Sequence, residues 1–196
     1  YEETPYSFVS AAIRTVEELG RAVRVPLSLF DLDITSELDD ASGRKFGLGS
    51  SAAVTVATVR ALAAFYGLPL TEMELFKLAL IASDEVQRSG SGGDIAASMF
   101  GGWIAYTSFD RGWLREQRFD VPIRDLISMD WPGLSVRPLT PPLELGLLVG
   151  WPGTPPSPSR LVGDVPARKG LHGTHYTQIL SRTEPSVAGP AGAFSA

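Results

Sequence analysis

Apolar and polar positions follow two different periods along the first part of the chain. Between Tyr6 and Leu19, apolar residues recur every three or four positions, which predicts an amphipathic helix. From Val23 to Ile34 they alternate with polar residues instead, which predicts a half-buried strand. The helical period returns from about Ser51 to Tyr66 and ends at Gly67. The chain therefore begins with helical and strand patterns in alternation.

The same mixture continues further along the chain. Thr71 to Glu74 forms a capping-box signature for a helix that reaches about Gln87. A glycine-serine turn precedes a short helix from Asp94 to Phe100, and 103–109 alternates as a strand. The proline-rich stretch 121–142 is expected to be mostly loop, with a short strand near 134–136. Three further elements are expected nearer the C-terminus: a buried strand at 143–149 and helices at 160–165 and 174–182. The pattern predicts α+β layers.

Composition narrows the classes of function. A hydrophobic content of 44% over 196 residues is enough for a core, and the net charge of −5 argues against nucleic acid as the main partner. Cysteine is absent and there are only two histidines, which excludes a disulfide framework and makes an all-protein zinc site improbable. Neither a membrane span nor a signal peptide is evident, so a cytoplasmic protein without a membrane partner is expected.

The most informative chemistry lies in a glycine-rich run. Gly47, Gly49 and the adjacent hydroxyls of Ser50 and Ser51 follow two cations and precede the helical pattern that begins near Ser51. Glycine backbone can approach a ligand closely, and a helix start attracts anions, so this run predicts phosphate binding. The alternative is a glycine turn with a serine N-cap. The run matches neither a Walker A loop nor the Rossmann fingerprint.

The run from Gly47 to Ala53 resembles the ATP-binding motif of the GHMP kinases, the superfamily of galacto-, homoserine, mevalonate and phosphomevalonate kinases. Two later stretches, 90–106 and 150–162, are most similar to the bacterial phosphomevalonate kinase branch. The resemblance implies a ribosomal protein S5 domain 2-like ATP-binding domain at 1–140 and the start of a second α/β domain at 141–196. It also implies ATP and Mg²⁺ as ligands and 5-phosphomevalonate as the substrate.

The resemblance also implies roles for individual residues. Asp94 would be the catalytic base or electrostatic organiser, although its position also suits a plain helix cap. Ser50 and Ser51 would contact the metal or the phosphates. The residues implied to bind ATP are Lys45, Gly47, Leu48, Gly49, Ser50, Ser51 and Ala52. The residues implied to bind substrate are Ser91, Gly92, Ser157, Ser159 and Arg160.

Several alternatives stay open. Ser157, Ser159 and Arg160 form a hydroxyl-cation cluster that suits a phosphate or carboxylate but also suits a surface loop. Asp84 and Glu85 lie near the place of a metal-binding glutamate in the family, although a solvated helix face is the favoured interpretation. The family also has a lysine on an earlier strand, which is expected to lie before Tyr1. The chain is therefore expected to be a piece of a longer kinase with little turnover alone; another GHMP kinase or a non-catalytic nucleotide-binding remnant are the alternatives.

Overall fold

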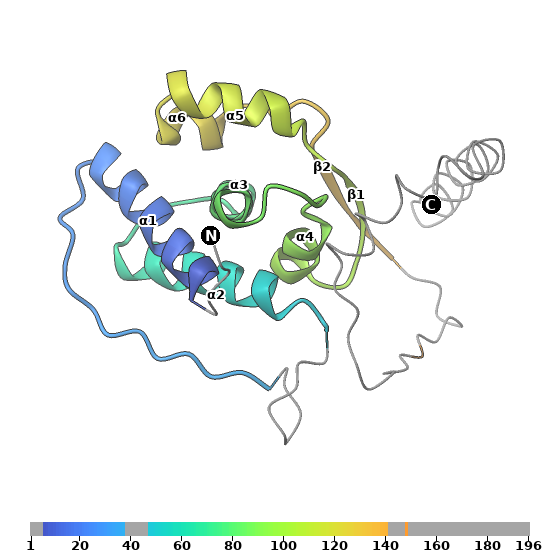
Figure 1. Cartoon of the computed structure of the whole chain (residues 1–196), viewed down its shortest axis with the longest axis horizontal. Helices are drawn as coiled ribbons and strands as arrows, with labels where there is room; N and C mark the ends of the chain where they lie inside the picture. The colour runs from blue at the N-terminus through green and yellow to red at the C-terminus, as the bar shows by residue number, and fades with distance from the viewer. Residues whose placement is uncertain (1–5, 38–46, 141–147, 149–196) are drawn as a thin grey trace. The chain divides into compact units, whose positions relative to one another are not determined.

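The protein is described here by a computed structural model, which places residues 6–37, 47–140 and 148 (Figure 1). Helices dominate these ranges, and β1 pairs with β2 in a two-stranded sheet. The elements are α1 (Ser7–Ala22), α2 (Ser50–Phe65), α3 (Glu72–Val86), α4 (Gly93–Phe100), β1 (Trp103–Thr107), α5 (Arg111–Asp120), α6 (Ile123–Ser128) and β2 (Ser135–Leu139).

Three predicted helices form the centre of the core. α1 packs on α2 and α3, and α2 packs on α3 and α4. Their inner faces bury side chains such as Val16, Val59 and Phe76, none of which is measurably exposed. Burying side chains of this size stabilises the folded state by about 1.5–3 kcal/mol each. The apolar periodicity therefore predicted α1 and α2, and the capping-box signature predicted α3.

The capping box predicted at Thr71 is confirmed. The Thr71 hydroxyl accepts a hydrogen bond from the Glu74 backbone amide at 3.2 Å, and the Glu74 carboxylate accepts one from the Thr71 amide at 2.8 Å. These bonds lower the pKa of Glu74, chiefly through the Thr71 backbone amide. Two amides that the start of α3 would leave without partners are thereby satisfied.

Two helices, α5 and α6, were not predicted, because α5 consists mostly of polar residues and α6 is short. The Asp110 side chain caps α5 by accepting from the Trp113 amide at 3.0 Å. Arg118 then makes two hydrogen bonds of 2.9 Å to Glu18 of α1, which holds α5 to the core. These bonds are the largest cause of the raised pKa of Arg118.

Lys77 of α3 is a buried cation, with 5% of its surface exposed. Its Nζ donates to the Met129 carbonyl at 2.7 Å, immediately after α6, and lies 5.9 Å from the Trp131 ring. Burial lowers the pKa of this lysine, and the neighbouring carboxylates Asp130 and Glu74 partly oppose that shift. The contact joins α6 to α3.

The strand predicted from Val23 to Ile34 is wrong. This segment carries no helix or strand assignment and runs as an open stretch beside α1 and α2 (Figure 1). Phe30 still packs its ring edge-on against Phe65 and Tyr66, at 5.8 and 6.4 Å, whereas Leu29 is fully exposed. A strand needs a hydrogen-bonding neighbour, and none of the described segments pairs with this one.

The chain divides into two compact units. One comprises Tyr1–Ser36 with Gly49–Arg137, and the other comprises Glu37–Leu48 with Pro138–Ala196. The domain boundary expected at residue 140 remains a prediction, as do the elements expected at 143–149, 160–165 and 174–182, because those ranges fall on residues that the structure does not describe. None of the helices in the described ranges is long and apolar enough to cross a membrane.

Candidate active site

The first glycine turn leads directly into α2. Gly49 is the N-cap of this helix in the left-handed conformation, with φ of 81°, and α2 has no side-chain cap. Among the described residues, nothing lies within 4 Å of a Cβ atom built on Gly49. The start of α2 is therefore open where backbone amides and the helix dipole favour an anion.

The residues predicted to bind ATP differ in exposure. Leu48 is 61% exposed, and Ser50 and Ser51 are half-buried. Ala52 is 2% exposed and belongs to the core, so only its backbone could contact a ligand. Gly47 has a left-handed φ of 77°. Lys45 and the predicted substrate residues Ser157, Ser159 and Arg160 lie outside the described residues.

The second glycine turn, 90–92, leads into α4 in a related way. Gly92 is the N-cap, with φ of 77°. A Cβ on Gly92 would lie 2.6 Å from Leu80 Cδ2 and 3.1 Å from the Tyr106 hydroxyl oxygen. Glycine is required here both by the backbone conformation and by the close approach of α3 and β1. The Ser91 hydroxyl accepts a hydrogen bond from the Gly93 amide at 3.2 Å, so this side chain supports the turn.

Asp94 is exposed in the first turn of α4. Its Oδ1 accepts a hydrogen bond from the adjacent Ile95 amide at 2.9 Å. Ile95, Ala96 and Met99 are buried on the opposite side of the same helix. The amphipathic pattern of α4 therefore holds the Asp94 carboxylate at the surface.

The other end of α4 is anchored to α2. Arg60 donates from Nη2 to the Met99 carbonyl at 2.8 Å and to Glu72 at 2.7 Å. α4 packs directly on α2. The structure therefore brings two sets of predicted site residues onto neighbouring helices: Ser50, Ser51 and Ala52 on α2, and Gly92 and Asp94 at the start of α4, with Ser91 just before it.

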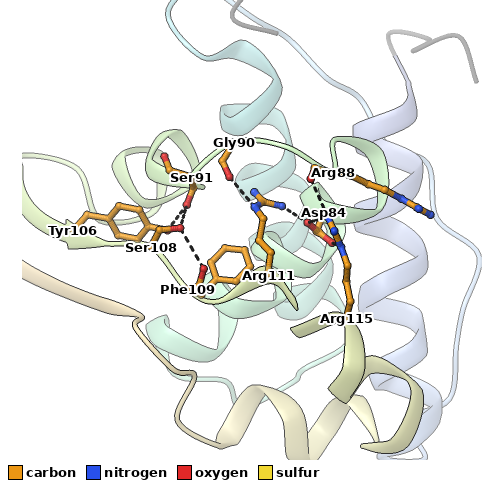
Figure 2. A network of polar contacts seen from close by, with 9 residues as sticks. All are labelled: Asp84, Arg88, Gly90, Ser91, Tyr106, Ser108, Phe109, Arg111 and Arg115. Atoms are coloured by element: carbon orange, nitrogen blue, oxygen red, sulfur yellow. Dashed lines mark hydrogen bonds and ion pairs between the residues drawn. The ribbon is translucent and has the colours of Figure 1, made fainter. Parts of the chain in front are cut away.

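Side chains after α4 bind the backbone of the second turn (Figure 2). The Ser91 carbonyl accepts hydrogen bonds from the Tyr106 hydroxyl at 2.6 Å and from the Ser108 hydroxyl at 2.8 Å. Burial raises the pKa of Tyr106, and the charge of Asp94 adds to this, while the Ser108 hydrogen bond and Arg111 oppose it. Tyr106 is therefore a protonated donor at neutral pH.

Asp84 lies at the centre of an arginine cluster at the same turn, shown in Figure 2. It is ion-paired with Arg111 and, at 3.3 Å, with Arg115. Arg111 also donates from Nε to the Gly90 carbonyl at 2.7 Å. The solvated face favoured for Asp84 is therefore wrong, because only 12% of its side chain is exposed and two cations neutralise it.

Glu85 is also engaged in ion pairs. Its carboxylate lies 3.4 Å from Arg14 of α1 and 3.4 Å from Arg118 of α5. Both pairs join α3 to other helices, which gives this acid a structural explanation. Among the described residues, no group of three or more histidine, cysteine, aspartate or glutamate side chains could hold a metal.

The oxygen donors that remain near the helix starts fit a hard cation. Mg²⁺ prefers oxygen ligands and retains several waters, with one or two protein ligands and substrate phosphates completing its shell. The hydroxyls of Ser50 and Ser51 and the exposed carboxylate of Asp94 are donors of this kind. Magnesium binding by Ser50 and Ser51 stays a prediction, and the chemistry of these donors is compatible with it.

Tyr106, Ser108 and Arg111 were not predicted as site residues. Tyr106 belongs to the glycine-tryptophan stretch that carries the family resemblance, which was a usable signal. Arg111 had none, because its partners Asp84 and Gly90 lie 27 and 21 residues earlier in the chain. Such contacts become visible only in the folded chain.

The sequence of this chain is similar to those of known kinases. Residues 7–102 match the GHMP kinases N terminal domain. The chain is 44% identical over 181 residues to the phosphomevalonate kinase of Streptomyces sp. (strain CL190), which covers 91% of this chain and 48% of that protein. It is 32% identical to the mevalonate kinase of Pyrococcus horikoshii, over 94% of this chain and 45% of that protein.

Solved structures agree with this assignment. The Lin0012 protein from Listeria innocua matches with a TM-score of 0.90 and 34% identity, over 99% of this chain and 54% of its own. Streptococcus pneumoniae phosphomevalonate kinase, in complex with phosphomevalonate and AMPPNP, matches with a TM-score of 0.65 and 30% identity, over 71% and 42% of the two chains. The chain spans about half the length of these relatives. The domain match, the sequence identity and the fold agree, and residues 7–102 of this chain form a GHMP kinase N-terminal domain.

Proposed function

We propose that this chain is part of a phosphomevalonate kinase. The enzyme would transfer the terminal phosphoryl group of ATP to 5-phosphomevalonate, giving ADP and 5-diphosphomevalonate. The observation that carries the proposal is the 44% identity to a curated phosphomevalonate kinase over 91% of this chain. The relative from Streptococcus pneumoniae binds phosphomevalonate and AMPPNP, a pair of ligands that corresponds to the proposed substrates.

The start of α2 is the proposed site for the ATP phosphates. Its open Gly49 backbone and uncapped first turn suit a polyanion, because the free amides and the helix dipole are both favourable there. Lys45, Gly47, Leu48, Ser50, Ser51 and Ala52 complete the proposed nucleotide contacts. Ser50 or Ser51 would hold Mg²⁺, which supplies charge neutralisation on the phosphates when bound.

Asp94 is the proposed catalytic residue. The reaction breaks the bond between the terminal phosphorus and the ADP oxygen, and forms a bond from that phosphorus to a phosphate oxygen of the substrate. That acceptor oxygen is already largely deprotonated near neutral pH, because the second pKa of a phosphate monoester is about 6. Asp94 would therefore orient the acceptor more than remove a proton. Ser91, Gly92, Ser157, Ser159 and Arg160 are the proposed substrate contacts.

Mevalonate kinase is the second candidate. The match to the mevalonate kinase of Pyrococcus horikoshii covers 94% of the chain, which favours a related acceptor without the phosphate. The two candidates differ in whether the acceptor oxygen belongs to an alcohol or to a phosphate. An alcohol needs a base far more than a phosphate does, so the choice also affects the role of Asp94.

A coupled ADP-release assay tests the proposal. The complete open reading frame that contains these residues and the 196-residue chain would each receive ATP, Mg²⁺ and one of three acceptors: mevalonate, 5-phosphomevalonate or 5-diphosphomevalonate. We expect the complete protein to prefer 5-phosphomevalonate. A preference for mevalonate would favour the second candidate, and no turnover with any acceptor would favour a non-catalytic remnant.

A further inference from the structure

Two consecutive carbonyls of the second glycine turn are held by side chains that follow α4. The Gly90 carbonyl accepts from Arg111 Nε, and the Ser91 carbonyl accepts from both Tyr106 and Ser108 (Figure 2). A peptide unit is planar, so fixing a carbonyl also fixes the amide of the next residue. These three side chains therefore set the orientation of the backbone that begins α4.

The donors are themselves held in place. Arg111 is ion-paired with the nearly buried Asp84 and lies 5.0 Å from the Phe109 ring. The Tyr106 ring packs edge-on against Phe76 of the core at 6.3 Å. A donor side chain that is itself fixed can hold the backbone of the turn in one position, whereas a mobile donor would move together with the turn.

Asp94 lies two residues after this turn, in the first turn of a helix whose other end is anchored by Arg60. Because the C-terminal end of α4 is held, the position of the second glycine turn determines where the N-terminal end of α4 and the Asp94 carboxylate lie. We propose that Tyr106, Ser108 and Arg111 are positioning residues for Asp94, which hold its carboxylate in place without touching the reacting atoms. This inference rests on the proposed function, because it assigns a purpose to the position of Asp94.

The expected size of the effect follows from the geometry of phosphoryl transfer. Such transfer depends mainly on position and charge, with little covalent chemistry for the protein to do. A displacement of about 1 Å by a distant change costs about 10²-fold in rate. Loss of one neutral hydrogen bond is expected to lower kcat about threefold to tenfold. Loss of both donors to the Ser91 carbonyl, Tyr106 and Ser108, should lower kcat by close to 10²-fold.

The test uses kcat and KM in the complete open reading frame, with ATP and 5-phosphomevalonate as substrates. Tyr106→Phe and Ser108→Ala should each lower kcat, and the double variant should lower it about 10²-fold. The KM for ATP should change by less than about twofold, because the proposed nucleotide site at α2 is untouched. Ser108→Thr retains the hydroxyl that donates to the Ser91 carbonyl. The variant that combines Tyr106→Phe with Ser108→Thr should therefore have the same kcat as Tyr106→Phe alone.

Two matched controls separate positioning from general damage. Ser135→Ala removes a hydroxyl that bonds Thr107 across the same sheet at 3.2 Å without contacting the turn. Arg118→Ala removes two ion pairs, with Glu18 and Glu85, from the same helix as Arg111, again away from the turn. Both controls should keep kcat, whereas Arg111→Ala should lower it. Variants that lower kcat no more than these controls, or that raise KM instead, would overturn the positioning role.

Hydrogen exchange over residues 89–96 separates this inference from the proposed function. The double variant should exchange faster there, and Ser135→Ala should not. If the complete protein transfers no phosphoryl group, the proposed function fails, and the exchange result still decides whether the donors order the turn. Unchanged exchange in the folded double variant would overturn the inference even in an active enzyme.

Discussion

The turns before α2 and α4 end on glycines in nearly the same backbone conformation, with φ of 81° at Gly49 and 77° at Gly92. Their surroundings differ. A Cβ at Gly49 would meet open space, whereas at Gly92 it would overlap Leu80 and crowd Tyr106. The first turn has no described neighbour within 4 Å of that Cβ position, and the second turn is packed and hydrogen-bonded to the protein.

The difference separates two uses of glycine. At the open turn, glycine keeps the approach free for a ligand and provides the left-handed conformation. At the packed turn, glycine lets the chain lie close to α3 and β1, so that a neighbouring side chain, Asp94, is held at a fixed place. We therefore expect substitutions at the open turn to affect binding, and substitutions at the packed turn to affect stability and rate.

The largest effect is expected from Asp94→Asn, which removes the charge but keeps the shape and the oxygen that accepts from the Ile95 amide. In the complete protein, kcat should fall about 10²-fold or more with little change in ATP affinity, measured by ADP release and calorimetric titration. Asp110→Asn is the matched control, since Asp110 also accepts from a helix amide. Near-normal kcat in Asp94→Asn would leave Asp94 with only its local hydrogen bond to the Ile95 amide.

Gly92→Ala should cost stability, about 2–3 kcal/mol of unfolding free energy in urea. An L-residue in the left-handed region costs about 1–2 kcal/mol, and overlap with the buried Leu80 adds to this. Gly49→Ala, with the same φ but open space, should lose only about 1 kcal/mol. Equal losses at the two glycines would contradict the distinction between a packed and an open turn.

Gly49→Val should weaken ATP binding about tenfold or more in calorimetric titration, while the protein stays folded. The β-branched side chain would occupy the approach to the α2 amides, and a tenfold loss corresponds to about 1.4 kcal/mol. Gly67→Val is the control, because Gly67 has φ of 63° in equally open space just beyond the opposite end of α2. Equal affinities in the two variants would remove the first turn from the nucleotide site.

The smallest effect concerns α3, which is capped by side chains instead of glycine. The folded pKa of Glu74 lies below its ordinary value, so its contribution to stability is present above the unfolded pKa of about 4.3 and is lost as pH falls through the folded pKa. Urea unfolding of the wild type and Glu74→Gln between pH 6 and pH 3 should therefore converge at the acid end. Thr71→Ala should cost about 1 kcal/mol at neutral pH.

Local sequence patterns predicted the helices that are stabilised by local capping bonds or by burial of one apolar face. The periodicity of α1 and α2, the capping box at Thr71 and the glycine-serine turn before α4 all correspond to observed elements. The position of Asp94 at the start of α4 was also predictable, because the glycine turn and the buried Ile95 fix it. The ligands that these sites bind remain predictions.

The rest depends on contacts between distant residues. α5 has few apolar residues, and it is held by the Arg118 pair with Glu18, which lies 100 positions earlier in the chain. Asp84 could not be assigned to an ion pair without knowing that Arg111 returns to it. The alternation from Val23 to Ile34 suits a strand, but alternation alone supplies no neighbouring strand to bond with.

The buried Lys77 offers a chemical report on local opening. Its ammonium is enclosed between α3 and the end of α6, where it bonds the Met129 carbonyl. Amine-reactive reagents attack the neutral amine, which the lowered pKa favours, yet they can reach it only when α6 separates from α3. The acylation rate of this single amine, followed by mass spectrometry, would therefore measure how readily α6 separates from α3 while the rest of the protein stays folded.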